Sequence, residues 1–508
     1  MAENIEENIQ EEVTPDNMNE VESPEIEIEA SMDEEQEDQE PQMTDEQSEA
    51  VEFFQNLAET MDDRVLTSLA MELVADYKKD KESRSDWEKS YISGLDLLGF
   101  KYDNASGPFL GASSVTHPLL AEAVTQFQSQ AYKELLPSDG PVRTQVVGNS
   151  TEEREQQAER VKEFMNYMIM DQMEEYTPEF DQMLFYLPLA GSTFKKVYYD
   201  ELMDRAVSKF IPAEDLVVPY YATDLKDCER ITHVLKMSEN DILKKQRAGF
   251  YRDIDILPSR KDDSDIQDKY DQLEGSSNPS DTDYQFNVLE MHVDLDLEEF
   301  EMDSDEKNIK VPFIVTLDEG SGEILSIYRN YDMKDEKQRR KDYFVHYKFL
   351  PGLGFYGFGL IHMIGGLSRT ATAALRQLLD AGTLSNLPAG FKSRGMRIRD
   401  EDQPFQPGEF RDVDAPGGNI KDQFQILPFK EPSGTLFQLL GFVVQAGQRF
   451  AAIADMQVGN DTQNRNVGTT VALMERGSRV MSAIHKRLYY GMRQEFRLLG
   501  KVFGSYLP

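Results

Sequence analysis

The stretch from Gly352 to Asp455 decides the fold, and it opens with the glycine-rich run GLGFYGFGL (352–360). From about Ile361 to Ala381, apolar residues recur every three or four positions, which predicts a helix with one apolar face. Leu387-Pro388-Ala389-Gly390 then breaks this pattern. A second helical run opens at Gly434 and reaches about Asp455. We therefore expect two helices joined by an insert, whose apolar residues suffice for a small β-containing lobe but not for an independent core.

The two predicted helices differ in how their polar residues are arranged. In the first helix Arg369, Arg376 and Asp380 lie opposite the apolar face, and Arg376 and Asp380 are one turn apart, where they can pair weakly. The second helix is apolar around most of its circumference, so most of that surface must be buried. One line along the helix is not apolar, and its polar members are Gln438, Gln445, Gln448 and Asp455. This polar stripe is available to water, a neighbouring chain or a channel.

Three long phrases of the chain resemble portal proteins of tailed double-stranded DNA bacteriophages, in the branch of the short-tailed phages. They are GFYGFGLIHMIGGLSRTATAALRQLLDAGTLSNLPAGF (354–391), GASSVTHPLLAEAVTQFQSQAYKELLPSDGPVRTQVVG (111–148) and VGNDTQNRNVGTTVALMERGSRVMSAIHKRL (458–488). The resemblance covers roughly Trp87 to the end of the chain. It implies an α+β portal-type protomer with a helical stem, a β-rich clip, a mixed α/β wing and a helical C-terminus.

The resemblance also implies how the chain divides into segments. The expected segments are 1–41, a disordered acidic tail; 42–187, the helical part of the wing; 188–350, its β-rich part with a mobile insertion at 258–283; 351–387, the first stem helix; 388–432, the clip; 433–455, the second stem helix; 456–467, a channel loop; and 468–508, a helix leading to a crown that is short or missing.

Two groups of candidate site residues follow from the resemblance. The loop between the second stem helix and the final helix is placed in the channel, and its polar residues are Gln457, Asn460, Asp461, Asn464, Arg465 and Asn466. Near the start of the clip lies a cluster of three arginines, Arg394, Arg397 and Arg399. Two interpretations are equally good: the cluster is a docking surface for an acidic partner or DNA phosphate, or it is a solvated edge strand.

The family's role implies partners rather than catalysis. The expected assembly is a homo-oligomeric ring, twelve-fold in this family, at one vertex of the virion capsid and assembled in the host cytoplasm. Its expected partners are the large terminase subunit, a tail or adaptor protein, the major capsid and scaffolding proteins, and double-stranded DNA that passes without sequence specificity. Neither an enzymatic activity nor a cofactor or metal is expected.

Composition limits the other possibilities. The formal net charge of −41 over 508 residues argues against any surface that grips a nucleic-acid backbone by counter-ion release, because such binding needs clustered Lys and Arg. The lone cysteine, Cys228, fits a reducing compartment. No signal peptide or uninterrupted span of about 20 apolar residues is visible.

Three alternatives remain from other functional classes. A membrane-associated pore would use Pro351–Leu367, and flotation with liposomes would reveal it. A non-enzymatic acidic scaffold protein would need no channel. A nucleotide-binding enzyme would use the glycine run, but Phe355 and Tyr356 occupy the turn that would approach a pyrophosphate, and no second βαβ unit follows. The six histidines show no metal-binding spacing.

Overall fold

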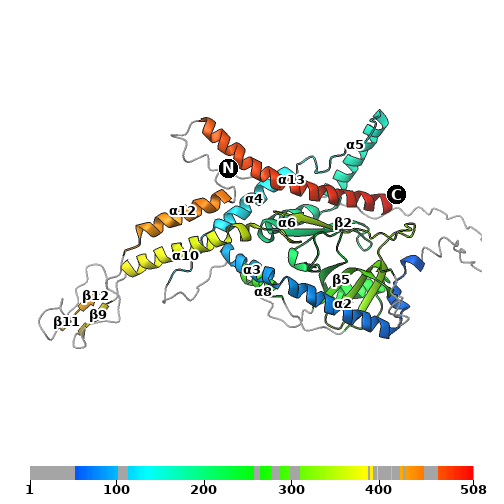
Figure 1. The fold of residues 1–508 in the computed structure, drawn as a ribbon, viewed down its shortest axis with the longest axis horizontal. Coiled ribbons are helices and arrows are strands. Elements are labelled where there is room, and N and C mark those ends of the chain that lie inside the picture. The colour runs from blue at the N-terminus through cyan, green and yellow to red at the C-terminus, as the bar shows by residue number, and fades with distance from the viewer. Residues whose placement is uncertain are drawn as a thin grey trace, which may run out of the picture. The chain divides into compact units, whose positions relative to one another are not determined.

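The computed structural model describes most of the chain beyond its acidic N-terminal segment (Figure 1). The described residues are 52–100, 112–256, 264–276, 285–297, 309–386, 390–392, 397–398, 413–414, 424–426, 431–450 and 467–506. The expected acidic tail, 1–41, and the expected channel-loop residues, 456–466, lie outside them.

Helices dominate the first third of the described chain, and strands follow. The α-helices are α2 (Asp63–Ser83), α3 (Ser85–Leu95), α4 (Leu119–Leu135), α5 (Glu152–Tyr167), α6 (Tyr176–Ala190), α7 (Glu239–Arg247), α8 (Asp265–Glu274), α10 (Leu360–Asn386), α12 (Gly434–Phe450) and α13 (Val467–Tyr506). Short 3-10 turns are η1 (Leu57–Glu59), η2 (Asp96–Leu98) and η4 (Ala213–Asp215), and η3 (Met168–Gln172) is a π-helical turn.

A three-stranded antiparallel sheet in the order β2-β1-β8 forms the centre of the largest hydrophobic core. Its strands are β1 (Ser192–Asp200), β2 (Arg205–Ile211) and β8 (Phe344–Lys348). The chain enters β1 from α6, which ends at Gly191 with φ +83°, a conformation that glycine adopts without a steric cost. The core joins this sheet to α3, α4, α6 and the C-terminal half of α13.

A second, five-stranded antiparallel sheet has the order β3-β4-β5-β6-β7. Its strands are β3 (Leu216–Val217), β4 (Arg230–Ser238), β5 (Gln285–Leu295), β6 (Val311–Asp318) and β7 (Ile324–Arg329). The sequence Asp-Glu-Gly-Ser-Gly (318–322) favours a hairpin turn, and it forms the turn between β6 and β7. Asp318 Oδ2 closes this turn by accepting from Ser321 N at 2.7 Å and Oγ at 2.8 Å. Apolar side chains of α2 cover this sheet and form a second core with it.

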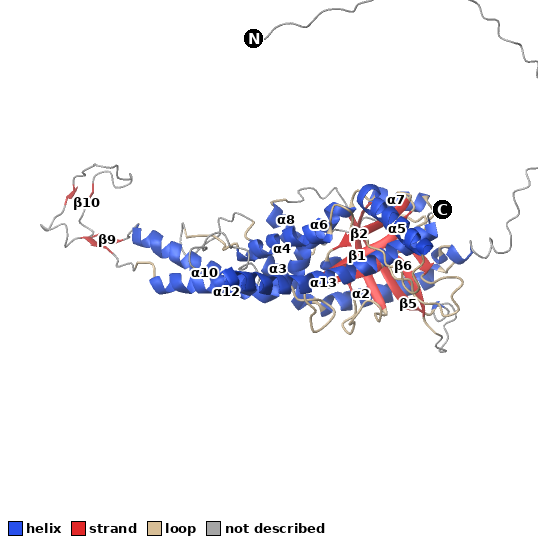
Figure 2. Ribbon diagram, turned by 90° about the horizontal axis from the view of Figure 1, so that it is seen from above, coloured by secondary structure: helices blue, strands red, loops and turns tan. Residues whose placement is uncertain are grey.

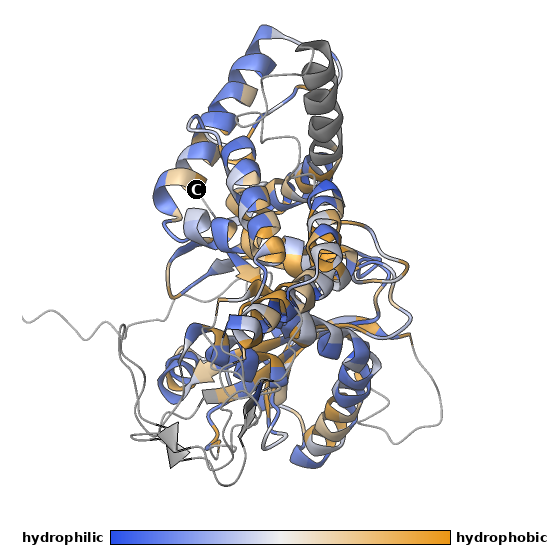
Figure 3. Cartoon of the chain, turned by 90° about the vertical axis from the view of Figure 1, so that its left-hand side faces the viewer, coloured by the Kyte–Doolittle hydropathy of each residue, from blue (hydrophilic) through white to orange (hydrophobic). Residues whose placement is uncertain are grey.

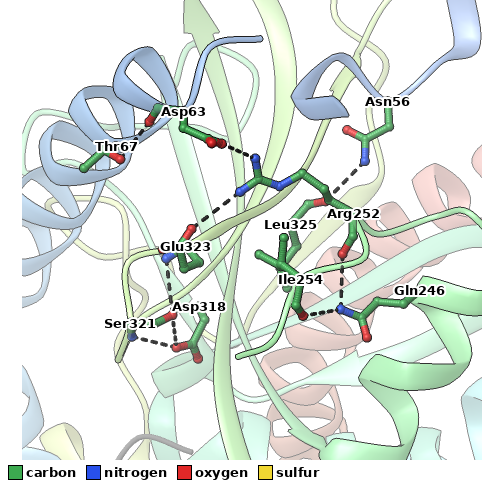
Figure 4. Close-up of polar contacts among 10 residues, drawn as sticks. All are labelled: Asn56, Asp63, Thr67, Gln246, Arg252, Ile254, Asp318, Ser321, Glu323 and Leu325. Carbon is green, nitrogen blue, oxygen red and sulfur yellow. Dashed lines mark hydrogen bonds and ion pairs between the residues drawn. The ribbon is translucent and has the colours of Figure 1, made fainter. Parts of the chain in front are cut away.

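Polar contacts attach η1, α2 and the loop after α7 to this sheet (Figure 4). Asn56 donates from Nδ2 to Leu325 O at 3.2 Å and accepts at Oδ1 from Ile327 N at 2.9 Å, so its buried amide acts as an extra strand contact. Arg252 bridges Asp63 at 2.9 Å and Glu323 at 3.5 Å. These contacts place the start of α2 on the edge strand β7.

Three local expectations were wrong. The insertion 258–283 was expected to be exposed and without periodicity, but its described part contains α8, which Ser264 caps by accepting from Gln267 N at 3.2 Å and which buries Ile266. Helical spacing predicts one helix over Thr44–Thr60, but Asn56 interrupts its described part and caps η1. Residue type predicts a cap at Ser85-Asp86 before Trp87, but Arg84 occupies the N-cap position of α3 and both residues lie inside the helix.

The helices α10 and α12 extend side by side away from the two sheets, and α13 lies against the three-stranded sheet (Figures 1 and 2). Short strand pairs follow α10 in the chain: β9 (Gly390–Lys392) with β12 (Phe424–Ile426), and β10 (Arg397–Ile398) with β11 (Val413–Asp414). Hydrophobic residues concentrate towards the middle of the folded body and hydrophilic ones on its outer helical turns (Figure 3).

Candidate functional site

The glycine run before α10 serves close backbone packing. Gly357 N donates to Ser192 Oγ at 2.7 Å, and the same hydroxyl lies 3.0 Å from His346 Nε2. A Cβ at Gly359 would lie 2.2 Å from Leu189 O, a distance that no side chain can accept. These glycines therefore let the chain cross the end of α6 before α10 begins. Close backbone packing explains why glycines occur here, without any role in nucleotide binding.

The two bulky residues in that run are held in the core. Tyr356 stacks on Trp87 with ring centroids 5.2 Å apart and accepts from Arg84 at 3.1 Å. Arg84 also donates to the carbonyls of Ala213 and Leu216 at 3.0 Å each, so its buried guanidinium joins α3, η4 and the glycine run. This connection fixes the base of α10 against the body.

The polar residues of α10 hold a neighbouring segment. Arg376 donates to Val115 O at 2.8 Å and to Ser114 O at 3.0 Å, and Asp380 accepts from Ser113 N at 2.7 Å. The weak Arg376–Asp380 pair is not among the ion pairs of the described residues. Arg369, by contrast, is exposed. Two of the three residues that the sequence offered for the stem's polar face thus act as tethers within the chain.

One face of α12 packs against its own chain. Val443 is buried, Leu436 and Leu440 are half-buried, and all three lie on the line that meets α10 and α4. Gly447 is on the same line, where an added Cβ would lie 2.4 Å from Leu119 Cδ2. Within the chain, then, α12 is covered along a single stripe.

The flanks of α12 expose large apolar side chains. Phe437 is 67%, Leu439 47% and Phe442 68% exposed. At 100° per residue, Phe437 lies on one side of the packed stripe, and Leu439 and Phe442 lie on the other. Large apolar side chains exposed on a helix mark a candidate contact surface, and α12 carries such side chains on both sides of its packed stripe.

The polar stripe of α12 lies opposite its packed face. Gln438 and Gln445 are exposed and Gln448 is half-buried. The fourth member, Asp455, lies outside the described residues. The helix consequently has three kinds of surface: one packed on α10 and α4, two apolar flanks, and a polar line facing away from α10. The exposed Arg449 lies between this polar line and the flank of Phe442.

The other expected site residues are only partly covered by the described chain. Arg397 lies in β10, opposite Asp414 of β11. Arg394 and Arg399 lie outside the described residues, as do Gln457, Asn460, Asp461, Asn464, Arg465 and Asn466. Their expected roles therefore stay predictions.

A buried ion pair that the sequence did not indicate anchors α13. Lys195 of β1 and Glu495 of α13 are fully buried, with Nζ 3.0 Å from Oε1. Ser208 Oγ donates to the same Oε1 at 2.6 Å, and Tyr347 donates its hydroxyl proton to Oε2. Lys195 Nζ also lies 3.8 Å from the centroid of the Tyr176 ring. Because 300 residues separate the pair in the chain, no local sequence pattern could have revealed it.

A second polar cluster lies between the two sheets. Lys196 of β1 donates to Glu290 Oε1 of β5 at 2.6 Å, and His292 Nε2 lies 2.8 Å from the same oxygen. Burial acts to raise the pKa of Glu290, but Lys196 and the nearby histidines outweigh it and hold this pKa well below its usual value. Burial, assisted by Lys196, lowers the pKa of His233 to about 3, so this histidine is neutral in the folded chain.

The described residues contain no group of three or more His, Cys, Asp and Glu side chains placed to hold a metal ion. In the same part of the chain, no helix has both the length and the apolar character that crossing a membrane requires. Cys228 is buried, its thiol donates to Arg230 O at 2.9 Å, and burial raises the pKa of this thiol to about 11.

Comparison with known proteins gives one finding. The model of the family described as Phage SU10 portal protein matches residues 195–506, which run from β1 through the last turn of α13. No curated protein matches the chain.

Proposed function

This chain belongs to the phage SU10 portal protein family, and on that premise we propose that it forms the ring at one capsid vertex through which double-stranded DNA is packaged and ejected. The family is structural and SU10 is a short-tailed phage, so the chain is a component of a phage virion. In the proposed role the ring, twelve-fold as in the family, docks the large terminase subunit first and a tail or adaptor protein afterwards. The ring supplies a path for DNA, and the energy for packaging comes from the terminase.

The observation that supports this proposal is the pair of apolar flanks on α12. A helix covered on one stripe and apolar on both sides of it fits a position between two neighbouring copies, each covering one flank. Contacts of that kind are heterologous, and they close into a ring when the rotation between copies divides a full turn. The exposed polar line of Gln438 and Gln445 would then remain uncovered between the flanks.

Within such a ring, α10 and α12 would form the stem, and the insert containing β9–β12 would form the clip. Arg394, Arg397 and Arg399 of the clip would meet the packaging motor and later the tail. The loop 456–467 would project into the channel, where Arg465 would attract passing phosphate weakly enough to permit sliding. The α2–α6 helices and the two sheets would form the wing.

Light scattering of the purified chain tests the proposal directly. We expect a mass many times the 58.2 kDa of one chain, and ring-shaped particles with a central hole in negative-stain images. A monomer at micromolar concentration that stays monomeric across a range of salt concentrations would contradict it. The variant Phe437→Ser/Phe442→Ser should lower the mass, whereas Leu202→Ser/Tyr220→Ser, which removes large exposed side chains from other surfaces, should not.

A further inference from the structure

The outer face of α13 carries a line of basic side chains. Lys486, Arg493, Arg497 and Lys501 are all exposed, and Tyr490, 63% exposed, lies among them. Their spacing of four, three, four and four residues places all five on one line of the helix. At 1.5 Å per residue the line is about 22 Å long. We name it the basic stripe.

No acidic side chain of the described chain neutralises the basic stripe. Among the described residues none of its four cations pairs with a carboxylate, although the whole chain has a net charge of −41. The one carboxylate between 483 and 506 is Glu495, which points the opposite way and is fully buried against Lys195. The stripe is therefore a concentrated positive charge on an otherwise strongly acidic protein.

The surface around the stripe is low and open. Gly500 and Gly504 lie on or beside the same line, and an added Cβ at either would meet no atom within 4 Å. A protein partner usually needs large apolar anchors at the centre of its contact, and here only two tyrosines are available, Tyr490 on the line and Tyr489, 44% exposed, beside it. A straight row of cations on a smooth helix surface instead suits a long, uniformly charged rod.

We propose that the basic stripe of α13 binds the phosphate backbone of double-stranded DNA. The inference rests on the proposed portal function, which brings duplex DNA to the assembly, and adds to it a second contact distinct from the loop 456–467. Four cations at intervals of about 6 to 10 Å along a helix can each meet a phosphate of a duplex, which carries one negative charge per about 1.7 Å of its axis. Such contacts read no base sequence.

The charge of the rest of the chain sets how strongly the stripe holds DNA. Affinity that comes from counter-ion release grows with the number of phosphates neutralised, and four contacts per chain are few. The acidic remainder repels the duplex from other surfaces, so DNA is directed to the stripe and held there loosely. Because these contacts are weak, the duplex can slide along its own axis while it stays next to α13.

The test measures the salt dependence of duplex binding. The full chain is titrated against a fluorescein-labelled 30-base-pair duplex between 20 and 200 mM salt, and the variant Lys486→Gln/Arg493→Gln/Arg497→Gln/Lys501→Gln is compared with it. Since each phosphate contact contributes about −0.9 to the slope of log affinity against log salt, we expect the slope to become shallower by about 3 or more. At 50 mM salt the affinity should fall at least tenfold.

A matched control removes the same charge elsewhere. Lys78, Lys79, Lys334 and Lys337 are exposed, and their replacement by Gln should change the duplex affinity by less than twofold. Equal slopes for the parent and the stripe variant, or equal losses for stripe and control variants, would overturn the inference. So would a parent chain that binds no duplex at 20 mM salt.

Two further readouts identify which partner the stripe takes and whether the ring itself forms. The first probe is a peptide of residues 1–41, which contains seventeen Asp and Glu and no Lys or Arg. If this peptide binds the parent but not the stripe variant, while both bind the duplex equally, the stripe binds an acidic protein segment and the DNA inference is wrong. Light scattering is run on the same samples. Intact rings with unchanged slopes overturn the stripe alone, whereas monomeric parent protein overturns the portal proposal.

Discussion

The helices α12 and α13 differ in how much of their apolar surface their own chain covers. The inner face of α13 is closed by its own chain, through the buried Lys195–Glu495 pair and the surrounding apolar residues. The flanks of α12 stay open, with Phe437 and Phe442 about two-thirds exposed. The comparison separates residues that fold one chain from residues that we propose join chains, and substitutions in the two helices should fail in different ways.

The largest expected effect belongs to α13. Glu495→Ala leaves the Lys195 ammonium buried without its partner, and breaking a buried pair in this way costs about 3–5 kcal/mol. Calorimetric melting should therefore show a large loss in Tm at any protein concentration.

The double variant Lys195→Met/Glu495→Leu provides the control for that experiment, because apolar residues of similar volume often replace a buried pair without loss. It should recover part of the Tm, since the charge is removed but the hydroxyls of Ser208 and Tyr347 lose their acceptor. A Glu495→Ala protein that melts with the parent would show that the pair does not anchor α13.

The next effect compares two neighbouring positions of α12. Phe442→Ser removes a side chain exposed in the single chain, so it should weaken ring assembly by about 1.5–3 kcal/mol per contact and leave the folding of the chain unchanged. Val443→Asp instead places an unpaired charge at a site 7% exposed between α12 and α10, and should unfold the α10–α12 hairpin.

Mass against concentration by light scattering, with amide hydrogen exchange of α10 as the folding readout, distinguishes these outcomes. Loss of exchange protection in Phe442→Ser, or a normal hairpin in Val443→Asp, would mean that the packed stripe and the flanks of α12 have been assigned the wrong way round.

A third effect, of about 2 kcal/mol, tests the five-stranded sheet, in which His233 lies on β4. His233 has a pKa of about 3 when folded and about 6.5 when unfolded, so the unfolded chain binds a proton that the folded chain does not. Stability should therefore fall as pH falls from about 6.5 towards 3, by about 2 kcal/mol at pH 5 from this residue alone.

Melting temperatures between pH 7.5 and 4.5 measure this dependence. The variant His233→Gln should show a flatter profile over that range, whatever its absolute stability. A profile as steep as that of the parent would assign the acid sensitivity to other groups, such as His292 and His346, whose pKa values burial also lowers.

Local patterns were enough to predict most elements of the fold. Alternating apolar residues predict strands that agree with β1, β2 and β4 to β8 to within about two residues at each end, because each of these strands has a well-buried face. The predicted ranges are Phe194–Tyr199, Ala206–Ile211, Arg230–Met237, Tyr284–Leu295, Lys310–Leu317, Ile324–Tyr331 and Tyr343–Phe349. The prediction failed where tertiary contacts decide. The strand expected at 216–221 shrinks to Leu216–Val217, since Pro219 has no amide to donate, and α8 depends on burying Ile266 in a distant core.

The site was predictable in outline only. The apolar circumference of α12 was visible in the sequence, but which stripe packs on α10 and α4 depends on Gly447 meeting Leu119, a contact between distant segments. Arg376 and Asp380 were placed on a polar face, whereas in the fold they bind the backbone of 113–115. The basic stripe had a readable signal, since Lys486, Arg493, Arg497 and Lys501 recur with helical spacing, but the overall charge of −41 concealed it.

The smallest expected effect lies on the polar line of α12. Gln445 is exposed on the side away from α10, so Gln445→Leu should change the free energy of unfolding of the chain by less than about 0.5 kcal/mol. If this line faces water in the ring, the mass by light scattering should also stay the same. If it is a seam between copies, losing the amide hydrogen bonds there should make the ring dissociate at a higher concentration on dilution.

Comparing dilution curves of Gln445→Leu and Phe442→Ser therefore shows which of the two surfaces of α12 contributes more to ring assembly. A Gln445→Leu ring that dissociates as readily as Phe442→Ser would assign the polar line, together with the flanks, to the contact between copies, and would leave α12 without any surface for a channel.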